Sequence, residues 1–282
     1  MSGPSQLWSR EIPWRQGHVL PADAIVALGL AHLEAEQTCV VVISHDCDLA
    51  SDNLDAEPDV EVIIGRLVNK GGGNFTWGKS PRTLHIDMLQ GEQAVSIELV
   101  STGKAIVPKE ELAKFVPDSS YSLSPQGLST LRSWLAARYN RAAFPDAFVD
   151  RMKATKVEER LAKAIEPHGS LISFVYFDID GGAELNHSDG TPYVLSIVLV
   201  YPPGDDADAA ADAADAVAAA VEASCNGRLV KEGKQSQDIV LKQCIAISED
   251  DISISQAKLL MHWRLEHLSS RATDAQPTPV VL

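Results

Sequence analysis

The sequence contains no stretch of eighteen apolar residues, so it lacks the span that a membrane-crossing helix needs. Its first residues, MSGPSQLWSREIPW, have no basic segment followed by an apolar core, and we therefore expect no signal peptide. Basic residues are also scarce: 24 Lys and Arg stand against 39 Asp and Glu, for a formal net charge of −15. Such a chain repels a phosphate backbone, which excludes wholesale wrapping of nucleic acid.

Cysteine is rarer still. The 4 cysteines are Cys39, Cys47, Cys225 and Cys244, and no two of them form a close pair motif. Without an export signal, this pattern favours reduced thiols and a cytoplasmic location over a disulfide framework.

Familiar catalytic signatures are missing as well. The chain has no Ser-His-Asp nucleophile elbow, HExxH pair, dinucleotide fingerprint or zinc-finger spacing, which lowers the expectation of an enzyme without removing it. A hydrophobic fraction of 45% and a charged fraction of 22% are nevertheless typical of a folded globular protein. With 282 residues, the chain is long enough for two modest domains.

The first third has the pattern of short strands joined by polar loops, which predicts a small β-barrel or curled sheet over residues 1–120. The predicted strands cover residues 39–43, 60–68, 83–88, 94–99 and 104–107. A glycine-rich run at residues 70–74 lacks the GK[ST] ending of a phosphate loop, so we expect a hairpin or mobile loop there.

The strand order of residues 16–68 resembles the SH3-like barrel of MazF/PemK-type ribonuclease toxins. In that family, an arginine precedes a valine-rich strand and a Ser or Thr closes it. Ser44 fits the closing position, but Glu36, Gln37 and Thr38 stand where the arginine belongs. The resemblance therefore implies a similar fold and does not carry over the catalytic pair.

The remainder predicts a helical connector and then a second module, which makes the chain an α+β protein. The connector covers residues 121–168, with one helix starting at Ser124-Pro125 and another over 146–165. Residues 169–271 predict an α/β sandwich of order ββαβα, with helices over one sheet face. Its elements are strands 171–177, 193–201 and 239–247 and helices 205–224 and 253–269, followed by a flexible tail at 272–282.

A dense polar cluster, His45-Asp46-Cys47-Asp48, follows the apolar run at 39–43 directly. If the strand continues through it, His45 and Cys47 share one face because strand side chains alternate. Cys47 is then a candidate nucleophile, with His45 or His85 as its base. The flanking carboxylates of Asp46 and Asp48 oppose thiolate formation, which favours a structural turn instead.

A metal site is a further interpretation of the same cluster. His85 and Asp87 also share a face of their predicted strand, so His45, Cys47, His85 and Asp87 could supply four ligands of the kind that zinc prefers. This set requires the two strands to be adjacent. No other cofactor is predicted.

The connector is locally basic in an acidic chain. Eight basic residues stand against four acidic ones between Leu128 and Lys163, for a local net charge of +4. Arg132, Arg138, Tyr139 and Arg141 are candidates for holding a phosphate, a nucleic acid or an acidic protein. The acidic C-terminal third of the same chain is the alternative that we favour.

These patterns favour a cytoplasmic interaction or regulatory protein that binds another protein, with nucleic acid as a further candidate partner. The polar cluster has the general look of uncharacterised bacterial proteins associated with mobile or defence loci. The competing hypothesis is a metal- or cysteine-dependent hydrolase, such as a nuclease, that uses His45, Asp46, Cys47, His85 or Asp87, with Arg138 and Arg141 holding phosphate.

Overall fold

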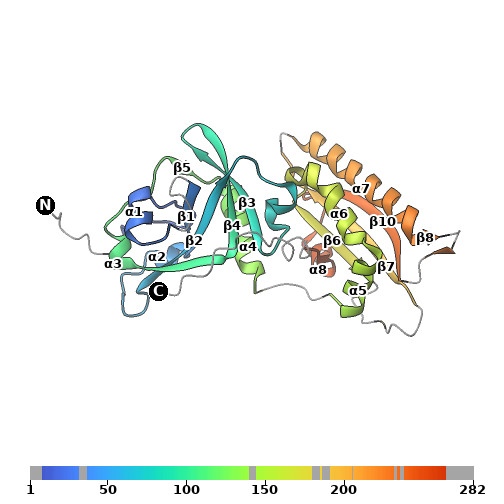
Figure 1. Cartoon of the computed structure of the whole chain (residues 1–282), viewed down its shortest axis with the longest axis horizontal. Helices are drawn as coiled ribbons and strands as arrows, with labels where there is room; N and C mark the ends of the chain where they lie inside the picture. The colour runs from blue at the N-terminus through green and yellow to red at the C-terminus, as the bar shows by residue number, and fades with distance from the viewer. Residues whose placement is uncertain are drawn as a thin grey trace. The chain divides into compact units, whose positions relative to one another are not determined.

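A computed structural model describes residues 8–31, 37–139, 144–179, 185, 191–204, 206–231, 234–235 and 238–264. The described residues form two compact units: unit 1 comprises residues 8–71 and 81–138, and unit 2 comprises residues 72–80 and 139–264. The predicted α+β class, with a curled N-terminal sheet, is confirmed (Figure 1). Within the described residues, no helix is long and apolar enough to cross a membrane.

Unit 1 is built on a five-stranded sheet with the order β1-β2-β4-β3-β5. All of its neighbouring strands are antiparallel. The strands are β1 (Thr38–Val42), β2 (Asp59–Val68), β3 (Thr83–Gln90), β4 (Gln93–Pro108) and β5 (Tyr121–Ser122). The strands predicted at 94–99 and 104–107 are therefore one long strand, β4.

Strands β2 and β4 do not pair in one continuous register. Their register shifts between Ile63 and Gly65, which is a β-bulge. A side chain at Gly65 would lie 2.6 Å from the Glu98 carbonyl oxygen, so only glycine allows the two strands to approach here.

Both faces of this sheet are covered by hydrophobic residues. One face packs against α4 (Pro125–Ala137), which contributes the buried side chains of Leu131 and Trp134. The other face packs under the N-terminal arm, residues 8–20, together with α1 (Ala22–Ala27) and α3 (Lys109–Leu112). Helix α4 begins where the sequence predicts, because the Ser124 side chain accepts a hydrogen bond from the Gly127 N–H.

Unit 2 contains a four-stranded sheet with the order β10-β7-β6-β11. Its strands are β6 (Phe174–Ile179), β7 (Tyr193–Tyr201), β10 (Ile239–Ser248) and β11 (Met261–His262). Strands β7 and β10 are parallel and are joined through the long helix α7 (Ala207–Leu229), as the predicted order ββαβα requires. A separate short hairpin pairs β8 (Val230–Lys231) with β9 (Lys234–Gln235).

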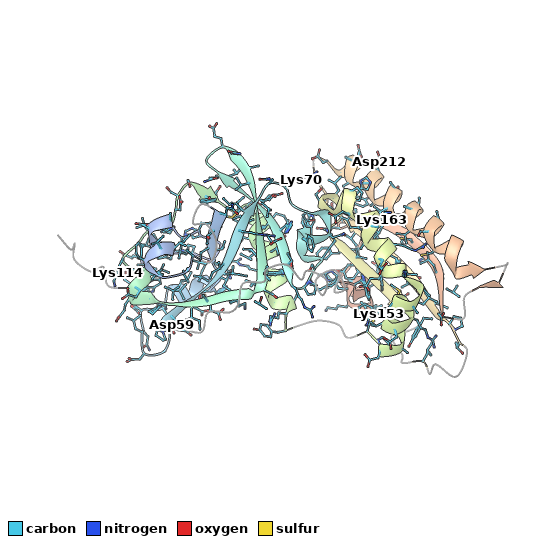
Figure 2. The ribbon with its side chains drawn as sticks, in the orientation of Figure 1. Asp59, Lys70, Lys114, Lys153, Lys163 and Asp212 are labelled. Carbon is cyan, nitrogen blue, oxygen red and sulfur yellow. The ribbon has the colours of Figure 1, made fainter. Side chains whose placement is uncertain are left out.

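Three helices bury their apolar sides against this sheet: α5 (Asp146–Thr155), α6 (Val157–Ile165) and α7. Lys153, Lys163 and Asp212 are exposed on these helices (Figure 2). The single helix predicted over 146–165 is interrupted, because Lys156 adopts the left-handed conformation with φ of 57°. The predicted connector is thus divided, with α4 in unit 1 and α5 and α6 in unit 2.

The closing helix is shorter than the predicted 253–269. Helix α8 covers Ile254–Leu259 and starts with a capping box between Ser253 and Gln256. The chain then turns into β11, and Trp263 stacks on Phe177 with ring centroids 4.5 Å apart. Burial of this indole in the core outweighs continuation of the helix; residues 265–282 lie outside the described part of the chain.

A segment that is contiguous in sequence with unit 1 packs within unit 2. We call residues 72–80, between β2 and β3, the strap; it includes the 3₁₀ segment η2 (Gly73–Gly78). The strap lies against a second 3₁₀ segment, η3 (Glu166–Leu171). The glycine-rich run is therefore neither the predicted hairpin nor a mobile loop, since it begins a docked segment.

Candidate functional site

The predicted cluster forms an exposed corner, His45–Asp48, rather than a strand end. Strand β1 stops at Val42, and the short helix α2 (Asp46–Leu49) starts with His45 as its N-cap. His45 Nδ1 accepts a hydrogen bond from the backbone N–H of Cys47 at 3.2 Å. The alternation expected of a strand therefore ends before the cluster, and it does not determine where His45 and Cys47 point.

The end of α2 is held by a buried lysine that the sequence analysis did not single out. Lys109 Nζ donates to the carbonyl oxygens of Asp48 at 2.7 Å and Ser51 at 3.0 Å. These carbonyls belong to the end of the helix, where a cation is favourable. The lysine follows Pro108 at the end of β4, so the sheet carries the group that anchors the corner.

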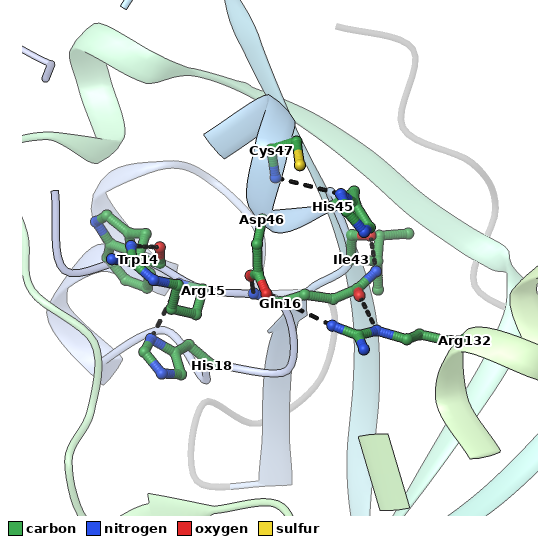
Figure 3. Close-up of polar contacts among 9 residues, drawn as sticks. All are labelled: Trp14, Arg15, Gln16, His18, Ile43, His45, Asp46, Cys47 and Arg132. Carbon is green, nitrogen blue, oxygen red and sulfur yellow. Dashed lines mark hydrogen bonds and ion pairs between the residues drawn. The ribbon is translucent and has the colours of Figure 1, made fainter. Parts of the chain in front are cut away.

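Asp46 has a different environment from its neighbours (Figure 3). Its Oδ1 accepts the backbone N–H of Gln16 at 2.8 Å, and its Oδ2 lies 3.5 Å from Arg132 Nη2. Gln16 in turn receives Arg132 Nε on its side-chain oxygen at 2.6 Å and donates to the Ile43 carbonyl at 2.8 Å. Asp46 thus joins the N-terminal arm, the corner and α4 within unit 1.

His18 completes the polar surroundings of Asp46. Its Nδ1 accepts the backbone N–H of Arg15 at 3.2 Å (Figure 3). Partial burial lowers the pKa of His18, the Arg15 charge lowers it further, and the Asp46 carboxylate opposes both. Because Nδ1 accepts this hydrogen bond, the neutral form of the His18 ring carries its proton on Nε2.

The hydrogen bonding of His45 argues against Cys47 as an activated nucleophile. The Cys47 thiol is exposed. However, the hydrogen bond between Cys47 and His45 comes from the Cys47 backbone N–H, and it occupies the lone pair on His45 Nδ1. A base needs a free lone pair directed at the thiol. Asp48 is exposed beside them, and its carbonyl is the group that Lys109 binds.

His85 and Asp87 belong to another polar group, on the central strands of the sheet. His85 Nε2 lies 3.0 Å from Glu98 Oε2, and Arg66 Nε donates to Glu98 Oε1 at 2.7 Å. Ser96 donates to Asp87 across the same two strands, β3 and β4. The bond to His85 is the main cause of a lowered pKa for Glu98; burial opposes this shift, and Arg66 supports it.

The four predicted zinc ligands are therefore not assembled. His45 and Cys47 lie at the corner, whereas His85 pairs with Glu98 and Asp87 with Ser96. Among the residues that the structure describes, no three His, Cys, Asp or Glu side chains are grouped so that they could hold a metal ion.

Three arginines of the predicted connector make hydrogen bonds within the protein. Arg138 donates to Ser101 Oγ at 3.0 Å. Arg151 donates to the Thr191 carbonyl at 2.7 Å, and Arg160 donates to the Ser224 carbonyl at 3.0 Å. These two arginines bind backbone carbonyl oxygens of the C-terminal third.

Tyr139 and Arg141 also belong to the predicted basic patch. Tyr139 is 81% exposed at the end of α4. Arg141 lies outside the described residues.

The residues missed by sequence analysis are those whose role depends on distant partners. Gln16 and Lys109 carry no local signal. Glu98 had one: it alternates with Ile97 and Leu99 in β4, which places its carboxylate on the face of the strand opposite those two side chains.

No protein-family model, curated protein or solved structure matches this chain. Its role is therefore inferred from its residues and their geometry.

Proposed function

We propose that this protein binds another protein through the corner His45–Asp48. The supporting observation is that the corner is exposed yet rigidly held, by Lys109 beneath α2 and by the Asp46 network beside it. Binding residues are commonly carried on loops that a rigid scaffold positions. The corner presents the His45 ring, the Cys47 thiol and the Asp48 carboxylate to solvent.

The charge of the surrounding chain indicates the chemistry of the partner. Residues 46–59 contain six acidic residues and no Lys or Arg. Those after the corner, which include Asp52, Asp55, Glu57 and Asp59, are exposed. Such a surface attracts a basic protein surface and repels nucleic acid. The partner in this proposal is therefore a protein with a basic face.

A cytoplasmic location belongs to the same proposal. All four cysteines are free, and three of them are buried. Free thiols are typical of a reducing compartment.

A hydrolase that uses Cys47 is the second candidate. The observation that favours it is the exposed thiol next to an imidazole and a carboxylate. Catalysis through this group requires the His45 ring to release the Cys47 N–H and turn toward the sulfur. A substitution of Cys47 by Ser then abolishes turnover of small thioester or phosphodiester substrates.

Site-directed photo-crosslinking tests the binding proposal. Cys47 is labelled with a thiol-reactive photo-crosslinker and exposed to an extract of the source cells. The control is a Cys47→Ser, Ser119→Cys chain, labelled at an exposed position of the same unit away from the corner. We expect one crosslinked protein from Cys47 alone, at a yield that falls with salt.

Charge reversal sharpens the test. Asp48→Lys together with Asp52→Lys should abolish the crosslink at low salt while Cys47 remains labelled to the same extent. Equal capture from Cys47 and from the control thiol, or capture that survives charge reversal, would contradict the proposal. Turnover that depends on Cys47 would favour the hydrolase.

A further inference from the structure

The strap is bound by a ledge of backbone carbonyl groups on η3. Lys79 is fully buried, and its Nζ donates to the carbonyl oxygens of Gly169 and Ile172, each at 2.7 Å, and to Thr76 Oγ1 at 3.2 Å. Trp77 Nε1 donates to the Ser170 carbonyl at 2.7 Å. Three carbonyls in the span 169–172 thus receive the donors of two strap side chains.

Asn74 and Gly78 of the strap also make hydrogen bonds to unit 2. The Asn74 backbone N–H donates to Glu166 Oε2 and its side-chain Nδ2 to the Ala162 carbonyl, both at 3.1 Å. Arg264, which follows β11, donates to the Gly78 carbonyl. Helix α6, η3 and the end of β11 therefore all contribute to one binding site for the strap.

Strap and ledge meet through a pair of glycines. A side chain on Gly73 would lie 2.1 Å from the Glu166 carbonyl oxygen, and one on Gly169 would lie 2.1 Å from the Gly73 carbonyl oxygen. No side chain fits at either position, because the two backbones are in contact. Gly71, one residue outside the strap, has no such restriction, since its nearest atoms lie at 3.6 Å.

The strap does not hold this shape by itself. Trp77 has a φ of 57°, a left-handed conformation that is costly for a bulky residue and persists only where its surroundings impose it. The bond from the Trp77 indole to Ser170 supplies that constraint. The site thus selects the bound conformation, as a peptide-binding site does.

We propose that this site is a peptide-binding site, and that the strap of a second copy of the chain can fill it. The ligand it recognises is a segment with Gly73 facing Gly169, an indole donor and a lysine side-chain nitrogen to occupy the carbonyl ledge. Exchange of identical straps reproduces every contact, so it requires no new surface. The strap of the same chain has the advantage of high effective concentration, and exchange therefore occurs mainly when that strap is impaired.

Complementation between two full-length variants tests this proposal. The strap variant carries Gly73→Ala and Lys79→Ala, and the site variant carries Gly169→Ala. Neither can form the native contact within one chain. A mixture can form it only when the intact strap of the site variant enters the intact site of the strap variant. We expect native mass spectrometry to show a heterodimer in the mixture after brief unfolding and refolding.

The controls separate exchange from aggregation. Each variant alone should give no dimer. A Lys70→Ala, Gly71→Ala chain, altered just outside the strap, should behave as wild type. A mixture in which both variants remain monomeric would overturn the proposal, and so would dimers that form equally well in the unmixed samples.

A second measurement applies even if one variant fails to fold. A fluorescent peptide of residues 70–82, KGGGNFTWGKSPR, is added in excess to the wild-type chain during refolding. We expect it to be retained and to be displaced by unlabelled peptide. A peptide with Lys79→Ala should compete about tenfold more weakly or worse, because it leaves the carbonyl ledge unsatisfied. Absence of retention, or equal competition by both peptides, would refute exchange.

Discussion

The backbone N–H of Gln16 donates to Asp46 Oδ1 at 2.8 Å, across 30 positions of sequence. The carboxylate that the sequence singled out as a candidate catalytic group thus fastens the N-terminal arm to the corner. Arg132 binds both residues and brings α4 into the same network. Asp46, which belongs to a motif with the residue types of a catalytic site, therefore has a structural role.

Substitution of Asp46 should therefore destabilise the protein. We expect Asp46→Ala to lower the free energy of unfolding by about 1–2 kcal/mol, because the Gln16 N–H and the Arg132 guanidinium lose an acceptor. Asp48→Ala is the matched control: it removes the same charge from the same helix and should change stability by less than about 0.5 kcal/mol. Urea unfolding measures the stability of both variants. Equal decreases in the free energy of unfolding would show that the Asp46 hydrogen bonds do not stabilise the fold.

Thiol labelling should single out Cys47. It is exposed, whereas burial raises the pKa of Cys39 and Cys244 to about 12 and that of Cys225 to about 11. We expect one thiol per chain to react quickly with an aromatic disulfide reagent at neutral pH and all four to react in denaturant. The fast phase should vanish in Cys47→Ser; fast labelling that persists would mean that a buried thiol is accessible.

Lys79 should make stability increase with pH. Burial lowers its pKa from 10.5 to about 7, although the Glu166 carboxylate opposes the shift. Between these values the unfolded chain holds a proton that the folded chain has released, so raising the pH favours folding. We expect Lys79→Met to flatten this slope between pH 7 and 10.5, whereas exposed Lys70→Met leaves it unchanged. Chemical denaturation between pH 7 and 10.5 measures this slope for the wild type and both variants. An equal slope in the wild type and Lys79→Met would contradict the prediction.

Glu98 should contribute to the pH dependence of stability at acidic pH. Its pKa is lowered chiefly by the hydrogen bond from His85 and further by Arg66. A depressed carboxyl pKa stabilises the folded chain above the ordinary value of 4.5, and this contribution is lost as pH falls through the folded pKa. We expect Glu98→Gln to lower stability at neutral pH and to reduce its dependence on pH below about 5. Parallel acid-denaturation curves for wild type and variant would contradict this role.

Much of the fold was predictable because its signals are local. The valine-rich run of β1 and the apolar runs of β6 and β7 have the composition of strands, and Ser124-Pro125 has the composition of a helix start. The order of elements in unit 2 was also predicted from these runs, because each run reports its own backbone preference.

The errors occur where a distant contact outweighs a local preference. The helical pattern after Ser253 continues past residue 260, but Trp263 is buried against Phe177 and the chain pairs with β6 instead. Likewise, nothing in residues 70–74 indicates that Gly73 will contact Gly169, 96 positions later. Propensity describes a residue and its neighbours, whereas these outcomes depend on partners far along the chain.

The candidate site shows the same division. By itself, the sequence determined that imidazole, thiol and carboxylate groups are gathered at His45–Asp48 and that the chain around them is acidic. Tertiary structure alone decided that Asp46 binds Gln16 and Arg132, that Lys109 holds the helix beneath, and that His85 pairs with Glu98 instead of joining His45. The reason is physical: hydrogen bonds and ion pairs depend on distances in space, and those distances exist only once both faces of the curled sheet are packed.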